Sequence, residues 1–116
     1  MEHGSINYIE FAARDIAATK TFFSQVFGWI FEDYGPEYSA FEAKGLMGGF
    51  YLADLASSAE SGAALMVFYS QELEQTERDV IDAGGKINRE IFSFPGGRRF
   101  HFKEPSGNEM AVWSDK

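Results

Sequence analysis

The amino-acid sequence predicts an α+β protein made of two consecutive copies of a strand-helix-strand-strand-strand (βαβββ) module. Three observations carry this prediction: the order of apolar patterns along the chain, a spacing that recurs in both halves, and the similar hairpins that close them. The length of 116 residues suits one domain, and 45% hydrophobic and 16% aromatic content favours a packed aromatic core. We therefore treat residues 1–116 as a single domain.

The first module, about residues 5–54, opens with a strand and a helix. Apolar and polar residues alternate in SINYIEFAARD, so Ile9 and Phe11 share one face of a strand. Asp15 is a residue type typical of a helix N-cap, apolar residues follow at helical spacing, and Gly28 supplies the stop. Three further strands are predicted at residues 29–35, 37–45 and 46–54.

The second module, about residues 62–115, repeats this order after the small polar linker LASSAESG. Ser70 is the predicted cap of a helix whose apolar stripe includes Leu73 and Val80, and glycines from Gly84 onward end it. The strands predicted in this module cover residues 63–70, 86–94, 98–104 and 108–115.

Spacing supports an internal duplication. Tyr8 lies 20 residues before Gly28, and Leu65 lies 20 residues before Gly85. In the closing hairpins FEAKGLMGGFYLAD and FKEPSGNEMAVWSD, the matching glycines Gly45 and Gly107 are offset by 62 residues, against 57 earlier in the module. The difference places about five extra residues near SFPGG in the second copy, and hairpin loops tolerate such insertions.

Two stretches, IEFAARDIAATKTFFSQVFGW and DAGGKINRE with the later FKEPSGNEMAVW, resemble the signatures of the vicinal oxygen chelate superfamily. This superfamily includes glyoxalase I, extradiol dioxygenases, fosfomycin-resistance enzymes and bleomycin-resistance proteins. The resemblance covers residues 6–114. It implies that each module curls into a half-barrel, and that the two form a cupped mixed sheet with the helices outside and a ligand cavity inside.

Period-2 alternation assigns one face of each strand to this implied cavity. Arg99 is expected on the same face as His101, and Ser39 on the same face as Phe41. The aromatic side chains on these faces are also compatible with ordinary core packing; they are Tyr8, Tyr51, Tyr69 and Trp113. The predicted ligand-binding residues are Tyr8, Glu10, Phe41, Met47, Tyr51, Leu65, Val67, Tyr69, His101, Glu109 and Trp113.

The resemblance also locates the places where the metal enzymes of the superfamily hold a divalent ion. One side chain comes from the first and one from the last strand of each module, usually His or Glu. The matching positions here are Tyr8, Gly49, Leu65 and Ala111. Three of these side chains have no donor atom, and a phenol with an ordinary pKa of about 10 is a poor ligand. We therefore expect no metal site and no cofactor.

The sequence favours binding over catalysis but leaves enzymatic activity open. We expect metal-independent binding of a small organic molecule, planar or cationic, because aromatic faces stack on planar rings and attract cations. Glu10 and Glu109 are either an acid-base pair or partners of Arg99, and His101 is either structural or a ligand contact. The alternative functions are a metal-dependent glyoxalase-like lyase or dioxygenase, and an interaction module without a ligand.

Composition limits the partners and the location. The net charge of −8, from 18 acidic and 10 basic residues, disfavours nucleic acid and anionic membranes. The chain has no Cys, no visible signal peptide and no apolar run of about 18 residues, so we expect a cytoplasmic protein. We also expect a homodimer, with the modules paired within one chain or swapped between two, because the short linker permits both.

Overall fold

The computed structural model covers residues 1–116 and confirms the predicted order of two βαβββ modules and the α+β fold class. Neither of its two helices has the length and apolar character that a membrane-crossing helix needs. The elements are β1 (Tyr8–Ala13), α1 (Ile16–Phe27), β2 (Ile30–Asp33), β3 (Tyr38–Ala43), β4 (Leu46–Leu52), β5 (Met66–Tyr69), α2 (Leu73–Asp82), β6 (Lys86–Phe94), β7 (Gly97–Lys103) and β8 (Glu109–Ser114).

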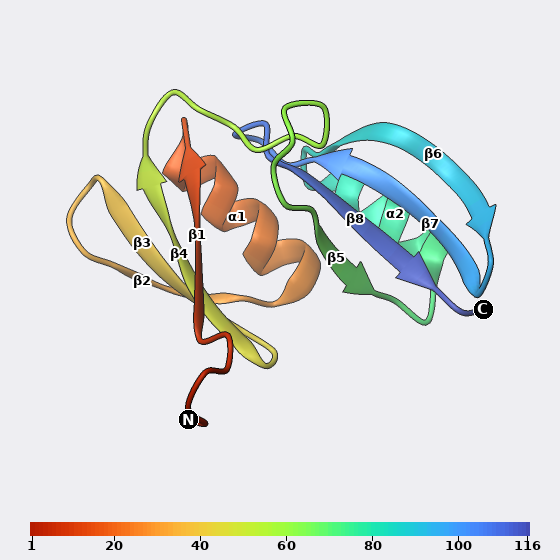
Figure 1. Cartoon of the computed structure of the whole chain (residues 1–116). Coiled ribbons are helices and arrows are strands. Elements are labelled where there is room, and N and C mark those ends of the chain that lie inside the picture. Colours follow the sequence, from red (N-terminus) through yellow and green to blue (C-terminus); the bar gives the residue numbers. More distant parts are fainter.

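Each module forms its own four-stranded mixed sheet (Figure 1). The strand orders are β1-β4-β3-β2 and β5-β8-β7-β6. The first and last strands of a module are parallel neighbours, and the remaining pairs are antiparallel. No ladder joins the two sheets, so the cup implied by the resemblance consists of two separate open halves.

Helix α1 begins and ends where the sequence predicts. The Asp15 carboxylate accepts a hydrogen bond from the Ala18 N–H at 3.0 Å, which satisfies one of the free donors of the first turn. Gly28 ends the helix in the left-handed region, with φ of 72°, where a residue without Cβ meets no steric penalty.

Helix α2 begins differently from the prediction. Glu72, not Ser70, is at its N-cap and makes no side-chain capping bond. The Ser70 hydroxyl instead accepts a hydrogen bond from the Glu72 N–H at 2.9 Å and lies 2.7 Å from the Thr76 hydroxyl. Ser70 therefore stabilises the turn that leads into the helix, because two more residues are needed to turn the chain from β5.

Helix α1 packs between the modules and joins them through one aromatic core (Figure 1). The Phe27 ring stacks on Phe68 of β5 with 4.0 Å between ring centroids, and Phe22 lies 5.6 Å from Phe102 of β7. Phe23 of the same helix contacts module 1, and its ring centroid lies 5.6 Å from that of Phe50 in β4. The helices thus lie on the core side of both sheets. We call the opposite sides the module 1 open face and the module 2 open face.

A buried polar network at the turn before β8 also joins the modules. Glu104 is 2% exposed and accepts hydrogen bonds from the Thr19 hydroxyl at 2.6 Å and from the Ser106 N–H at 2.9 Å. The Asn108 amide donates both to Glu104 at 2.7 Å and to the Ala12 carbonyl at 2.8 Å. These donors satisfy the buried carboxylate without a cation and fix β8 relative to β1 and α1.

Candidate functional site

The predicted site residues lie on two open faces and do not surround one cavity. Leu65 precedes β5 and is half-buried. In the β1–β4 ladder, Tyr8 pairs with Met47, and in the β5–β8 ladder Tyr69 pairs with Trp113. The module 1 open face carries Tyr8, Glu10, Met47 and Tyr51, and the module 2 open face carries Val67, Tyr69, His101, Glu109 and Trp113.

The prediction that Phe41 faces a cavity is wrong. Phe41 is 2% exposed, and its ring stacks on Trp29 with 4.2 Å between centroids. A Cβ added to Gly48 would overlap the Phe41 ring, so the ring packs directly on the β4 backbone. Ser39 lies two residues away, is fully buried and shares this core side.

The reason for this error is the length of one turn. A two-residue turn joins β3 to β4, so an odd-numbered residue pairs with an even-numbered one, as Ala43 does with Leu46. A five-residue connection, 104–108, joins β7 to β8, so Lys103 pairs with Glu109 and parity is kept. Transferring the β7 parity to β3 therefore exchanges the two faces. Tyr38, not Phe41, belongs to the module 1 open face.

Tyr8, Tyr38 and Glu10 form a hydrogen-bonded chain on the module 1 open face. The Tyr38 hydroxyl donates to the Glu10 carboxylate at 2.8 Å. Because its single proton is used there, it accepts the 2.5 Å bond from the Tyr8 hydroxyl. Burial, with the hydrogen bonds to Tyr8 and Glu10, raises the pKa of Tyr38 far above its ordinary value. Tyr38 is therefore a neutral phenol throughout the physiological pH range.

The residues at the implied metal positions do not fit a divalent ion. Gly49, Leu65 and Ala111 have no side-chain donor atom, and a Cβ added to Gly49 would overlap the Tyr38 hydroxyl. Tyr38 therefore occupies the space that a ligand side chain at position 49 would need. No three carboxylate or imidazole groups of the chain lie close enough together to hold a metal ion.

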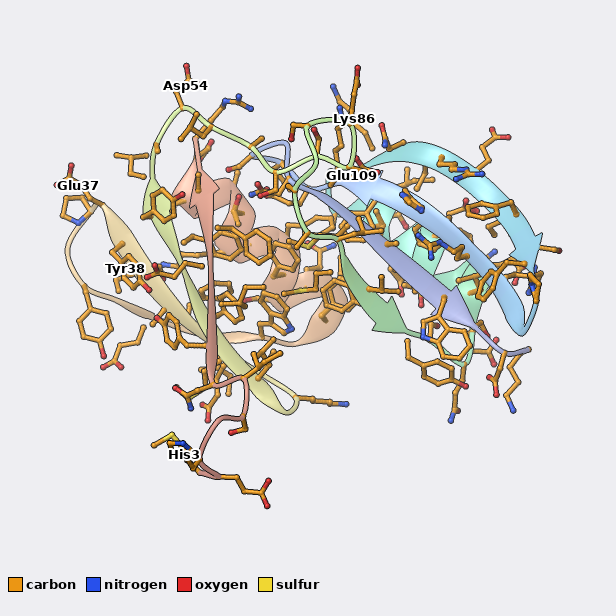
Figure 2. The ribbon with its side chains drawn as sticks, viewed as in Figure 1. His3, Glu37, Tyr38, Asp54, Lys86 and Glu109 are labelled. Carbon is orange, nitrogen blue, oxygen red and sulfur yellow. The ribbon has the colours of Figure 1, made fainter.

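His101 and Glu109 form a buried pair on the module 2 open face. Each is 6% exposed, and the His101 Nδ1 lies 2.9 Å from a Glu109 carboxylate oxygen. Burial by itself raises the pKa of Glu109, but the hydrogen bonds from His101 and from the Ala59 N–H outweigh it and hold the pKa below its ordinary value. Figure 2 shows Glu109 where the linker between the modules crosses the start of β8.

Two arginines extend this pair. The Arg99 guanidinium contacts His101 Nε2 through its Nη2 at 2.8 Å and its Nε at 3.2 Å. The Arg89 guanidinium lies 3.7 Å from the centroid of the Phe92 ring. Arg89 and Phe92 are absent from the predicted site because two irregularities of register in β6 break the alternation between Ile87 and Phe92.

The two open faces differ in charge, as their ladders show. Figure 2 shows Tyr38 and Glu109 in opposite halves of the molecule, so the faces are also well separated. The register places three carboxylates, Glu10, Glu32 and Glu42, on the module 1 open face. It places four basic side chains, Lys86, Arg89, Arg99 and Lys103, and one carboxylate, Glu109, on the module 2 open face.

A further cavity, of about 530 Å³, lies where the two modules meet. Nine of its ten lining residues are hydrophobic, among them Phe27, Met66 and Phe68, and Lys44 is the exception. Val67 and Tyr69 of β5 also contribute to it. Alternation within single strands could not predict this cavity, because it depends on how the modules pack against each other.

The arrangement of two βαβββ modules, each with its first and last strands parallel and adjacent, defines a two-module glyoxalase-like fold. Residues 5–112 match the Glyoxalase/Bleomycin resistance protein/Dioxygenase superfamily, and the chain belongs to this superfamily. No curated protein matches the sequence.

Solved structures share the fold at low sequence identity. A glyoxalase-related enzyme from Fulvimarina pelagi has a TM-score of 0.80 and 17% identity, over 96% of this chain and 88% of the other. A glyoxalase/bleomycin resistance protein/dioxygenase family enzyme from Burkholderia phytofirmans PsJN has 0.78 and 16%, over 95% and 98%. Lactoylglutathione lyase from Agrobacterium tumefaciens has 0.72 and 18%, over 97% and 95%. These similarities establish the fold alone.

Proposed function

We propose that this chain binds a small planar organic molecule without the help of a metal ion. One observation carries the proposal: the Tyr38 hydroxyl, bonded to Tyr8 and Glu10, fills the space above Gly49. The metal enzymes of the superfamily need a donor side chain at that position, whereas a binding protein needs only a suitable surface. The donor set therefore favours binding without a metal.

Exposed apolar side chains on both open faces support binding. Tyr8 and Met47 are 41% and 46% exposed, and Tyr69 is 48% exposed. Apolar groups gathered on one surface typically mark contacts with a ligand or partner, and aromatic rings stack on planar molecules. Glu10 beside Tyr8 suits a cation, whereas the guanidinium groups of the module 2 open face suit an anion.

The proposal is for binding and not for catalysis. His101 is the imidazole of the open faces, and both its ring nitrogens are already engaged, Nδ1 by Glu109 and Nε2 by Arg99. A general base needs a free nitrogen within hydrogen-bonding reach of the substrate. His101 therefore does not supply the free base that a lyase or dioxygenase would need, and the metal ligands are absent as well.

A second copy of the chain completes the site in this proposal. One chain leaves most of both open faces uncovered, and the two carry opposite charges. If the module 1 open face of one copy lies over the module 2 open face of another, the carboxylates face the basic side chains across the enclosed space, and exposed apolar side chains become buried. The resulting dimer encloses a cavity between two half-barrels.

Sedimentation velocity tests the dimer. The double variant Glu32→Lys/Glu42→Lys should sediment as a monomer at concentrations where the parent is a dimer, because its charge on the module 1 open face is reversed. The matched control Glu2→Lys/Asp79→Lys changes net charge equally away from this face and should stay dimeric. A monomeric parent, or equal effects of both double variants, would refute the arrangement.

A thermal-shift screen on chelator-dialysed protein tests the binding function. We expect hits among planar compounds, because a ligand at about 100 times its Kd stabilises the folded state by about 2.7 kcal/mol. A melting temperature that falls on chelation, or hits that all require an added divalent metal, would favour the lyase or dioxygenase instead. A screen without any hit would favour an interaction module.

A further inference from the structure

We propose that the module 2 open face contains an anion subsite, in which Arg99 and Arg89 bind the carboxylate of a planar acid. This inference rests on the proposed function and names the ligand class for one of the two faces. From the aromatic and acidic residues of the sequence we expect a planar or cationic ligand, whereas this subsite binds an anion.

The hydrogen bonds around His101 determine its tautomer. A guanidinium group has donors and no acceptor, so His101 Nε2, which faces Arg99 Nη2 and Nε, accepts both bonds and carries no proton. The ring proton therefore lies on Nδ1 and is donated to Glu109 at 2.9 Å. Glu109 is held in turn by the Ala59 N–H at 2.9 Å. This chain of bonds fixes the position of the guanidinium on the open face.

Arg99 keeps donors free for a ligand. Two of its five N–H groups bond to His101, which leaves three for an acceptor above the sheet. Arg98, which precedes Arg99 on the strand, lies on the opposite face and has its donors engaged. Its terminal nitrogens donate to Glu74 at 2.5 and 3.2 Å, and its Nε donates to the Lys116 carbonyl. Arg99 has no carboxylate partner, and neither has Arg89.

The charge count matches one monoanion. Arg89 and Arg99 each contribute one positive charge, neutral His101 contributes none, and the Glu109 carboxylate contributes one negative charge. Lys86 and Lys103 on the same face add only positive charge, and these four residues alone have a net charge of about +1. A single carboxylate, which an arginine fork binds through two parallel hydrogen bonds, neutralises it.

Aromatic rings flank these donors and explain why the acid should be planar. Phe92 lies 3.7 Å from the Arg89 guanidinium and 5.6 Å from that of Arg99, measured at its ring centroid. Trp113 pairs with Arg99 across the β7–β8 ladder and contacts Tyr69 edge to face at 5.2 Å. A flat ring stacked on Trp113 can therefore direct its carboxylate toward Arg99.

Calorimetric titration with benzoate, and with benzamidine as a planar cation of similar size, tests this subsite. We expect benzoate to bind the more tightly, and Arg99→Gln to weaken it about tenfold through loss of charge-assisted hydrogen bonds. Arg98→Gln, which removes the same charge from the other face of the same strand, should change benzoate affinity less than about twofold. Sedimentation velocity checks that each variant has the same oligomeric state as the parent, so that weaker benzoate binding does not result from loss of the dimer.

The variant His101→Phe tests the positioning role. It keeps an aromatic ring and every formal charge but removes the hydrogen bonds with Arg99 and Glu109, so benzoate should bind several-fold more weakly. Benzoate affinity of Arg99→Lys, which keeps the charge and loses the fork, should fall between those of the parent and Arg99→Gln. Equal effects of Arg98→Gln and Arg99→Gln, or tighter binding of benzamidine, would overturn the subsite. If another planar compound still binds, the proposed function survives that failure. If no planar compound binds, both fail.

Discussion

The two open faces show how one structural unit presents two chemistries. At matching places in the two ladders, Gly49 lies between Glu10 and Ala40, while Ala111 lies between Val67 and His101. The polar group comes from the first strand in module 1 and from the third strand in module 2. Both copies keep aromatic and aliphatic residues on the core side. The duplicated fold thus constrains the core, and the open faces are free to differ.

The largest expected difference in stability is between the two connections that lead into the last strand of each module, residues 44–45 and 104–108. Glu104→Ala in the β7–β8 connection should destabilise the protein by about 3 kcal/mol, because several buried donors lose their acceptor. Lys44→Ala, in the two-residue turn of module 1, should change stability by less than about 0.5 kcal/mol. Urea denaturation measures both values. Comparable losses in the two variants would show that the turns do not differ as described.

The backbone under Tyr38 is the next point of difference. Gly49→Ala should cost about 1 to 3 kcal/mol, because the new methyl group overlaps the Tyr38 hydroxyl and ring. Ala111→Gly at the matching place should cost only about 0.5 to 1 kcal/mol. In the double variant Tyr38→Ala/Gly49→Ala, the glycine substitution should add little further cost, because the obstructing ring is gone. Strict additivity would contradict the close approach.

A smaller effect concerns pH and the module 2 open face. The pKa of Glu109 is held below its ordinary value in the folded protein, so its ionised form contributes stability that is complete above the unfolded pKa of about 4.3. This contribution is lost as pH falls through the folded pKa. The stability difference between parent and Glu109→Gln should therefore be constant from about pH 7 to pH 5 and shrink below about pH 4.3. A difference that grows on acidification would reverse the sign of the shift.

Local patterns predicted the fold well because they encode it directly. Alternation in β1, β4, β5 and β8 assigned their faces, and Asp15 and Gly28 marked the ends of α1. The site was predicted only in part, for two physical reasons. The face of Tyr38 depends on the length of one turn, and the faces of Arg89 and Phe92 depend on bulges in β6. The separation of the open faces depends on packing between modules, which no single-strand pattern contains.

The most direct test of metal-independent binding on a particular face is an ¹H–¹⁵N NMR titration of benzoate into protein kept in a chelator. Backbone and side-chain resonances of Arg99, His101 and Trp113 should shift in a saturable way and by more than those of Tyr8 and Tyr38. The same shifts should appear without any added metal. Shifts that map to Tyr8 and Tyr38 instead, or that appear only after a divalent metal is added, would contradict the account.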